Sequence, residues 1–240
     1  MQDQFERLAR MIGPAAMERL AAARVAVFGL GGVGGYAVEA LARSGIGALE
    51  LVDPDEIGIT NLNRQLLATH QTLGQNKAQV AAQRVLSIHP ACRVTARPGF
   101  LLPQTAADFD FSSYDYVIDA IDTVTGKLAL IEAARAAGTP IICSLGTGNK
   151  LDPSALRVAD LYETRVCPLA RILRQECRKR GIDRLTVVYS EEPPLPTADG
   201  ADLTEQPPEG RRAIPGSCAF VPAAAGLLLA ARVVRDLIDR

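Results

Sequence analysis

Short runs of hydrophobic residues alternate along the chain with segments in which hydrophobic residues recur every three or four positions. The first pattern predicts buried strands and the second predicts amphipathic helices. A helix over 4–23, broken at Gly13–Pro14, precedes a strand at 24–28, a helix through Ala42 and a strand at 49–53. Further strands are expected at 93–96, 116–122, 140–144 and 185–189, and further helices at 77–87, 128–137, 168–179 and 223–238. This alternation predicts an α/β fold with a doubly wound, mainly parallel, Rossmann-like sheet.

The chain is predicted to form a single domain over 1–240, because no linker divides it into halves with separate cores. Its parts are an N-terminal helical arm (1–23), a core (24–150) and a C-terminal extension (151–240). Within the extension, the stretch Glu191 to Gly216 contains six prolines and few large hydrophobic residues. This composition predicts a mobile surface loop over 191–216.

Composition narrows the class of protein. The 240 residues are 48% hydrophobic and 22% charged, with a net charge of −1, which is typical of a globular protein without an overall basic coat. The five cysteines form no C-x-x-C pair, so paired zinc knuckles are excluded and a reducing compartment is favoured. The acidic N-terminus is unlike a signal peptide, and the longest apolar run, 219–231, is too short to span a bilayer. We therefore expect a cytoplasmic protein, with peripheral membrane contact through the C-terminal helix as a weaker alternative.

A glycine-rich motif follows the first strand. Gly29, Gly31 and Gly34 have the G-x-G-x-x-G spacing, and they lie between a strand and a helix. Such glycines let the backbone approach phosphates, while the helix N-terminus presents N–H groups to them. Asp53, at the end of the second strand, is placed to bind a ribose hydroxyl. On its own the motif favours an NAD-binding oxidoreductase.

Three charged residues change this interpretation. Arg64 follows the second strand, Lys77 begins the next helix, and Asp122 follows a later strand at the same edge of the sheet. Two cations suit a triphosphate better than a pyrophosphate, and a carboxylate is a ligand that Mg²⁺ prefers. The alternatives are two solvated surface cations and a carboxylate that caps a helix. Taken together, the three residues favour ATP and Mg²⁺, bound by the core at 24–150.

The run GLGGVGGYAVEALARSGIGALELVDPDEIGITNLNRQ, with GQNKAQVAAQRVLSIHP and YVIDAIDTVTGKLAL, resembles the ThiF/MoeB/HesA superfamily of ubiquitin-activating-like enzymes. The resemblance implies that ATP and Mg²⁺ are contacted by Gly32, Asp53, Asn61, Arg64, Lys77 and Asp122. The adjoining residues expected in the nucleotide site are Gly29, Gly31, Gly34, Asp55, Asn63, Gln65 and Thr123, and Asp122 is the expected Mg²⁺ ligand. The family also places an arginine from the partner subunit on the triphosphate. Arg7 matches its spacing and Arg10 is an alternative, which implies a homodimer.

The C-terminal half is similar to the bacterial tRNA threonylcarbamoyladenosine dehydratases, in the stretches GTGNKLDP at 146–153, PLARILR at 168–174 and GSCAFVP at 216–222. One departure is Cys167, where that subfamily usually has an acid. The resemblance implies ATP-dependent dehydration of threonylcarbamoyladenosine in tRNA through an acyl-adenylate. Arg7, Arg64, Lys77 and Asp122 are the expected catalytic residues. Alternatives are adenylation of a ubiquitin-like sulfur-carrier protein and a non-catalytic nucleotide-binding regulator.

Two further expectations concern the C-terminal half. Arg171, Arg174 and Arg178 are three and four positions apart on one predicted helix, so they are expected to share a face that contacts the tRNA anticodon arm. The alternative is a solvated basic face. Cys167 and Cys218 are candidate nucleophiles, but neither has a histidine nearby in the sequence. Buried small side chains are therefore the favoured interpretation of both.

Overall fold

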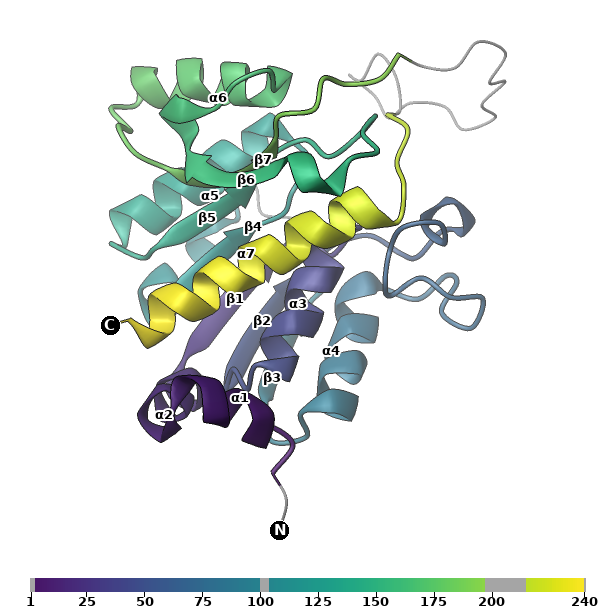
Figure 1. The fold of residues 1–240 in the computed structure, drawn as a ribbon, viewed down its shortest axis with the longest axis vertical. Coiled ribbons are helices and arrows are strands. Elements are labelled where there is room, and N and C mark those ends of the chain that lie inside the picture. Colours follow the sequence, from purple (N-terminus) through teal and green to yellow (C-terminus); the bar gives the residue numbers. More distant parts are fainter. Residues whose placement is uncertain (1–2, 100–103, 197–214, 240) are drawn as a thin grey trace.

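A computed structural model describes residues 3–99, 104–196 and 215–239 (Figure 1). Seven strands form one sheet in the order β3-β2-β1-β4-β5-β7-β6. The strands are β1 Arg24–Phe28, β2 Ala48–Val52, β3 Arg93–Arg97, β4 Tyr116–Asp119, β5 Ile141–Ser144, β6 Leu156–Asp160 and β7 Thr186–Ser190. The helices are α1 Glu6–Ile12, α2 Pro14–Ala22, α3 Gly34–Arg43, α4 Lys77–Ile88, α5 Val124–Ala136, α6 Pro168–Lys179 and α7 Phe220–Ile238. The predicted α/β fold is confirmed.

The sheet is parallel except at one edge. β1 lies between β2 and β4, with Val27 opposite both Leu51 and Ile118, and β7 pairs in parallel with β5. The edge strand β6 runs antiparallel to β7. The hydrophobic pattern did not predict β6, because only its first residue, Leu156, is buried and the other four are partly or fully exposed. An edge strand needs little burial on either face, so it leaves a weak signal in the sequence.

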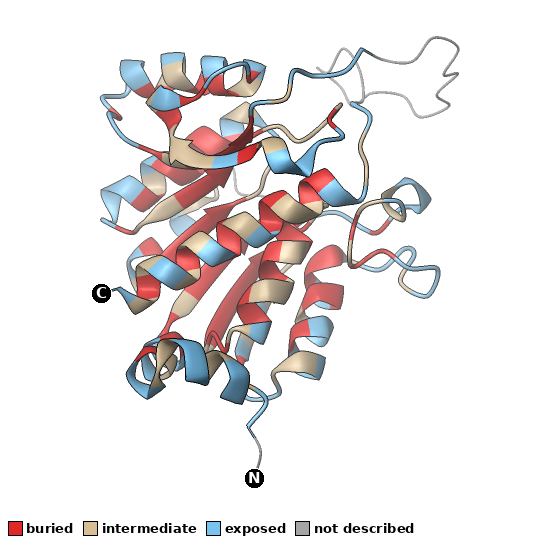
Figure 2. Ribbon diagram, viewed as in Figure 1, coloured by how far each residue is buried: buried red, intermediate tan, exposed pale blue. Residues whose placement is uncertain are grey.

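Helices cover both faces of the sheet. In Figure 1, α3, α4 and α7 cross the front of the strands and α5 lies behind them. The inner strands β1, β2, β4, β5 and β7 are the most deeply buried elements, whereas the two edge strands β3 and β6 are more exposed (Figure 2). Leu41 of α3, Val85 of α4 and Leu229 of α7 belong to one core cluster with strand residues. Much of the hydrophobic surface of α7 is therefore buried against the rest of the protein. No helix among the described residues is long and apolar enough to cross a membrane.

Two helices begin three or four residues before their predicted starts. α5 begins at Val124 instead of 128, because the Thr123 hydroxyl caps it by accepting a hydrogen bond from Gly126 N. α7 begins at Phe220 instead of 223, and it includes Pro222, which the first turn of a helix tolerates. The predicted loop 191–216 falls largely on residues 197–214, which lie outside the described part of the chain.

The N-terminal arm and the glycine loop lie at opposite ends of the strands: the arm at their amino ends and the loop at their carboxyl ends. α2 ends at Ala22, where the chain enters β1, and Ala48 N at the start of β2 donates to Ala23 O. The glycine loop leaves the other end of β1, which at about 3.3 Å per residue is roughly 16 Å away. The carboxyl ends of β1, β2, β4 and β5 thus form one edge, where ligands of such sheets bind.

Candidate nucleotide and acceptor site

The glycine loop connects β1 to α3 by a tight turn. Gly29 has φ of +87°, and a Cβ on it would stand 2.6 Å from the carbonyl oxygen of Ala120. A Cβ on Gly34 would stand 1.8 Å from the carbonyl oxygen of Gly29, so this glycine is required by packing within the loop. A Cβ on Gly31, in contrast, would meet only the side-chain amide of Gln65, at 3.7 Å. The loop is therefore tight on its inner side and has room for a ligand beside Gly31.

Asp53 fixes the shape of this loop from the end of β2. One carboxylate oxygen accepts a hydrogen bond from Leu30 N at 2.6 Å, and the other accepts from Asp55 N at 2.9 Å. The side chain is almost fully buried, and this burial raises the pKa of Asp53, while the nearby Lys77 ammonium and the two backbone N–H groups lower it. Asp53 lines the cavity described below, and its hydrogen bond from Leu30 N also orders the backbone of the glycine loop.

Lys77 is the first residue of α4 and is buried beside two carboxylates. Its Nζ lies 2.8 Å from Asp55 Oδ2 and 4.0 Å from Asp53 Oδ1. Asn76 caps the helix by accepting hydrogen bonds from Ala78 N and Gln79 N, so the position of Lys77 follows from the helix start. The alternative of a solvated surface lysine is wrong, because the side chain is only 7% exposed.

A turn after β2 carries Asn61, Arg64 and Gln65 to the same edge. A single 3₁₀ turn, Ile59–Asn61, is closed by Asn61 Oδ1, which accepts from Gly58 N, and Gln65 N donates to Asn61 O. Arg64 Nη1 donates to Thr60 O and to Asn63 Oδ1, which holds the guanidinium against the turn. Since a guanidinium has five N–H groups, the others stay available to a ligand.

Asp122 and Thr123 follow β4. Both are exposed and both line the cavity. The helix-capping alternative for Asp122 is wrong, because Thr123 supplies the cap of α5. Just before them, Asp119 is fully buried, pairs with Lys127 at 3.0 Å and accepts a hydrogen bond from Ile121 N. Lys127 also donates to Ser144 O at the end of β5, so one buried lysine joins the two strand ends that flank this part of the cavity.

These residues surround a cavity of about 600 Å³. Eleven of the thirteen residues expected in the nucleotide site line it: Gly29, Gly31, Gly32, Asp53, Asp55, Asn61, Arg64, Gln65, Lys77, Asp122 and Thr123. The two others lie elsewhere. Gly34 packs within the loop, and Asn63 is exposed, with its side-chain amide donating to Ser217 O. Asn63 and Gln65 are two positions apart, but the turn directs the Gln65 side chain into the cavity and the Asn63 side chain away from it.

The cavity continues beyond the expected nucleotide residues. Its second part, which we call the acceptor half, is lined by residues 144–148 after β5, Leu169 of α6, Pro215 and Ser217. None of these residues carries a charge, so the sequence did not predict them as site residues, although most of them lie in the stretches that resemble the dehydratases. The signal that remained was positional, since Gly146 and Gly148 follow a predicted strand at the same edge of the sheet as the other site residues.

The residues present suit a nucleoside triphosphate with one divalent cation. The open space beside Gly31, the N-terminus of α3, Arg64 and Lys77 together offer donors and positive charge to phosphates. The described residues include no cluster of three metal-ligating side chains. Such a cluster is not required for Mg²⁺, which nucleotide sites hold by one or two carboxylates, phosphate oxygens and water. Three carboxylates line the cavity: Asp53 and Asp55 lie beside Lys77, and the third is Asp122, the ligand expected from the sequence.

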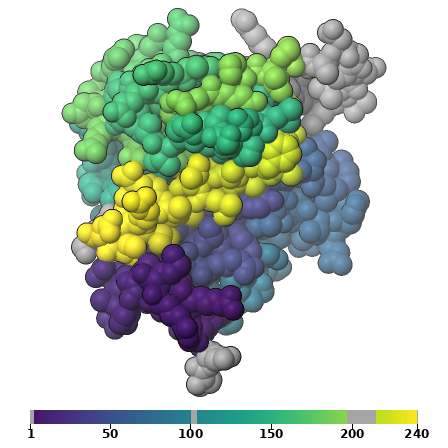
Figure 3. Space-filling model, in the orientation of Figure 1, coloured from purple at the N-terminus to yellow at the C-terminus, as the bar shows by residue number. Residues whose placement is uncertain are grey.

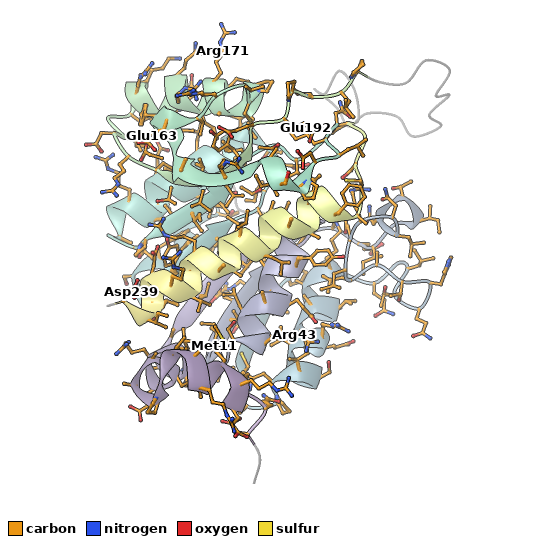
Figure 4. All side chains as sticks on the ribbon, viewed as in Figure 1. Met11, Arg43, Glu163, Arg171, Glu192 and Asp239 are labelled. Carbon is orange, nitrogen blue, oxygen red and sulfur yellow. The ribbon has the colours of Figure 1, made fainter. Side chains whose placement is uncertain are left out.

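The candidate residues outside the cavity separate into different environments. Arg7 and Arg10 are both exposed on α1. Arg10 pairs with Glu6 at 2.6 Å, whereas the Arg7 guanidinium makes no hydrogen bond or ion pair within the described residues. Arg171 projects from α6 into solvent (Figure 4), and Arg178 is exposed with its guanidinium 5.4 Å from the ring of Tyr162. Arg174 is half-buried and donates to Thr164 O at 3.0 Å, so of the three arginines expected on one face only Arg171 and Arg178 are exposed.

Both cysteines discussed above have packing partners. Cys167 is buried in the cluster that joins α5 and α6, and Cys218 is half-buried with its thiol donating to Lys150 O. Neither thiol lines the cavity. The interpretation of small buried side chains therefore fits the surroundings of Cys167 well and those of Cys218 in part.

The chain is similar to several known proteins in sequence and in structure. Residues 5–240 match the ThiF family. The tRNA threonylcarbamoyladenosine dehydratase of Bacillus subtilis is 40% identical over 243 residues, which cover 99% of this chain and 96% of that protein. Crystal structures of the E. coli tRNA N6-threonylcarbamoyladenosine dehydratase with AMP and with ATP both have a TM-score of 0.87, at 35% and 34% identity, covering 98% of this chain and 94% of theirs. A sulfur carrier protein adenylyltransferase of Thermus thermophilus is 34% identical over 142 residues, 58% of this chain and 52% of that protein.

Proposed function

The chain belongs to the ThiF family, and from this premise we propose that it is an ATP-dependent tRNA threonylcarbamoyladenosine dehydratase. The observation that carries the proposal is the cavity at the carboxyl edge of the sheet. There the glycine loop, Arg64, Lys77 and Asp122 surround space for a nucleotide, and the acceptor half provides space for a second substrate. The full-length similarity to the B. subtilis dehydratase, and the ATP and AMP complexes of the E. coli protein, support the same assignment.

The chemistry takes place in two steps. In the first, an oxygen of the threonyl carboxylate attacks the α-phosphorus of ATP, forms an acyl-adenylate and releases pyrophosphate. In the second, a nitrogen of the same side chain attacks the activated carbonyl carbon, closes a ring, loses its proton and expels AMP. The net change in the nucleoside is the loss of one water. Because nucleophile and electrophile belong to one molecule, the effective molarity is high and no nucleophile from the enzyme is required.

The protein contributes binding and charge neutralisation. Lys77 and Arg64 offset negative charge on the phosphates, and the backbone N–H groups at the start of α3 add fixed donors. Asp122 would hold Mg²⁺, which supplies further neutralisation of the phosphate charge. The buried pair Asp119–Lys127 keeps the loop that carries Asp122 in place.

We further propose that the active unit is a homodimer in which Arg7 acts on the site of the partner. Arg7 lies on α1, at the amino ends of the strands, whereas the glycine loop lies at their carboxyl ends. Arg7 therefore cannot reach phosphates bound in its own chain. α7 offers an apolar contact surface, because Phe220 and Leu227, seven positions apart on one face, are each 49% exposed. Figure 3 shows α7 crossing the middle of this face of the molecule.

Helix α6 is the element that we propose contacts the tRNA. Leu169 at its start lines the acceptor half, and Arg171 and Arg178 on the same helix are exposed. A tRNA whose modified nucleoside enters the acceptor half would bring the phosphates of the anticodon arm near these two guanidinium groups. Lys179 and Arg180 contribute less, because both pair with Glu176.

Mass spectrometry of tRNA nucleosides tests the function. We expect incubation of the protein with ATP, Mg²⁺ and tRNA that carries threonylcarbamoyladenosine to reduce the mass of that nucleoside by one water. AMP and pyrophosphate should form in equal amounts. An unchanged nucleoside, together with pyrophosphate release on adding a sulfur-carrier protein with a C-terminal glycine, would instead establish the carrier-activating alternative.

A further inference from the structure

Gln65 has an unsatisfied amide inside the cavity. Its side chain is 7% exposed, it lines the cavity, and within the part of the chain that the structure describes its Oε1 atom has no hydrogen-bond partner. The backbone around it is fixed, since Gln65 N donates to Asn61 O at 2.9 Å and Ala68 N donates to Gln65 O at 3.0 Å. An unpaired buried carbonyl destabilises the folded protein, so its retention points to a ligand.

The turn that carries the Gln65 side chain borders both parts of the cavity. On one side is the glycine loop, because Gln65 Nε2 is 3.7 Å from the place where a Cβ on Gly31 would stand. On the other side the same turn contacts the acceptor half, because Asn63 Nδ2 donates to Ser217 O at 3.0 Å. The turn that carries Gln65 therefore adjoins both the glycine loop and the acceptor half.

The chemistry of the ligand follows from the type of atom left unpaired. A carbonyl oxygen accepts hydrogen bonds, and so do all phosphate oxygens at neutral pH, so the polyphosphate cannot satisfy it. Lys77 and Arg64 already provide donors for those oxygens, and Asp53 is the acceptor placed for a ribose hydroxyl. A threonylcarbamoyl side chain, in contrast, carries the N–H groups of a ureido unit next to its carboxylate.

We propose that Gln65 binds the acceptor substrate: its amide carbonyl accepts a hydrogen bond from a ureido N–H and so directs the neighbouring carboxylate toward the α-phosphate. This inference rests on the proposed function and names the residue that selects its substrate. The sequence groups Gln65 with the nucleotide contacts, whereas the unpaired oxygen assigns its main role to the second substrate. The same contact keeps the side chain in the conformation from which the ring closes.

The test compares Gln65→Met with the wild-type protein. Methionine has a similar length and no polar group, so removal of an unpaired buried carbonyl should leave the melting temperature of the ligand-free protein unchanged or raise it by up to about 12 °C. ATP affinity should stay within about twofold of wild type, and the KM for modified tRNA should rise about tenfold, the equivalent of one hydrogen bond. Gln79→Met, at an exposed position of α4, is the matched control and should change none of these quantities.

A second measurement separates substrate positioning from a general loss of activity. The ratio of AMP released to nucleoside cyclised should be close to one in the wild type. It should rise above about two in Gln65→Met, because a misplaced side chain leaves the acyl-adenylate open to hydrolysis. Gln65→Leu should show the same two changes.

Three results would overturn the inference while the wild type still dehydrates its substrate. The first is a KM and a product ratio that do not change. The second is a loss of ATP affinity as large as the loss for tRNA. The third is failure of both variants to fold, which would make the amide structural. If the wild type itself leaves the nucleoside unchanged, the proposed function fails and not this assignment alone.

Discussion

Replacing Lys77 by methionine isolates the charge that the cavity offers to phosphates. The Lys77 ammonium lies 2.8 Å from the Asp55 carboxylate and 4.0 Å from the Asp53 carboxylate, and its side chain is 7% exposed. Two unit charges 4 Å apart attract by about 4 kcal/mol at an effective dielectric of about 20, before the desolvation of both groups is subtracted. Because Asp55 is 59% exposed, we expect a stability loss of only about 2 kcal/mol, or about 4–8 °C in melting temperature.

The effect on nucleotide binding should exceed the effect on stability. A hydrogen bond to a charged group contributes about 1.5–3 kcal/mol, so the Kd for ATP should rise about 10- to 150-fold. Isothermal titration calorimetry measures this directly. Arg84→Met is the matched control, because Arg84 lies on the same helix but pairs with Glu39 at the surface. It should cost at most about 1 kcal/mol and leave ATP affinity unchanged.

The pH dependence of stability adds a second readout of the same variant. Burial raises the pKa of Asp53 above its ordinary value of 3.8, and Lys77 opposes this rise. Ionised Asp53 therefore destabilises the folded state, and this cost is absent well below pH 3.8 and complete above the raised pKa. Without Lys77 the cost grows, so the melting temperature of Lys77→Met should fall further below wild type at pH 8 than at pH 5. If the Kd of Lys77→Met for ATP equals that of the wild-type protein, the reasoning is refuted.

Three further substitutions test other parts of the site. Asp122→Asn should raise the Mg²⁺ concentration for half-maximal activity at least tenfold with ATP affinity in the absence of metal unchanged, and an unchanged Mg²⁺ profile would exclude Asp122 as the ligand. At an ATP concentration near the wild-type Kd, Arg7→Ala and Lys77→Met should each have little activity alone and should recover about a quarter of wild-type activity when mixed and allowed to exchange subunits, and no recovery would contradict action across the dimer. Arg171→Glu should weaken tRNA binding severalfold at low salt, with little effect at high salt, whereas Arg93→Glu, at the far edge of the sheet, should not.

The nucleotide half of the site was predictable because its chemistry is carried by glycines and charges at strand ends. Parallel strands bring their carboxyl ends to one edge, so Asp53, Lys77 and Asp122 could be placed together from the order of elements alone. The acceptor half was not predictable in the same way. Its lining at 144–148 consists of two glycines and three uncharged side chains, and these give no charge pattern to detect.

Orientation within a single turn or helix was also beyond the sequence. Asn63 and Gln65 are two positions apart, and only the hydrogen bonds of the turn decide that Gln65 faces the cavity. Arg171 and Arg174 share one side of α6 by spacing, but the 3₁₀ turn Leu161–Glu163 packs beside that helix, and Arg174 binds the adjacent Thr164. Both differences arise from tertiary contacts, which periodicity does not record.

Transfer of a heavy oxygen isotope tests the central claim most directly. The modified nucleoside in tRNA would be labelled in both oxygens of its threonyl carboxylate and converted by the protein with unlabelled ATP in ordinary water. Attack of the carboxylate on the α-phosphorus predicts that each AMP released carries one labelled oxygen and that the dehydrated nucleoside retains the other. Unlabelled AMP beside a dehydrated nucleoside would contradict carboxylate adenylation as the route of the reaction.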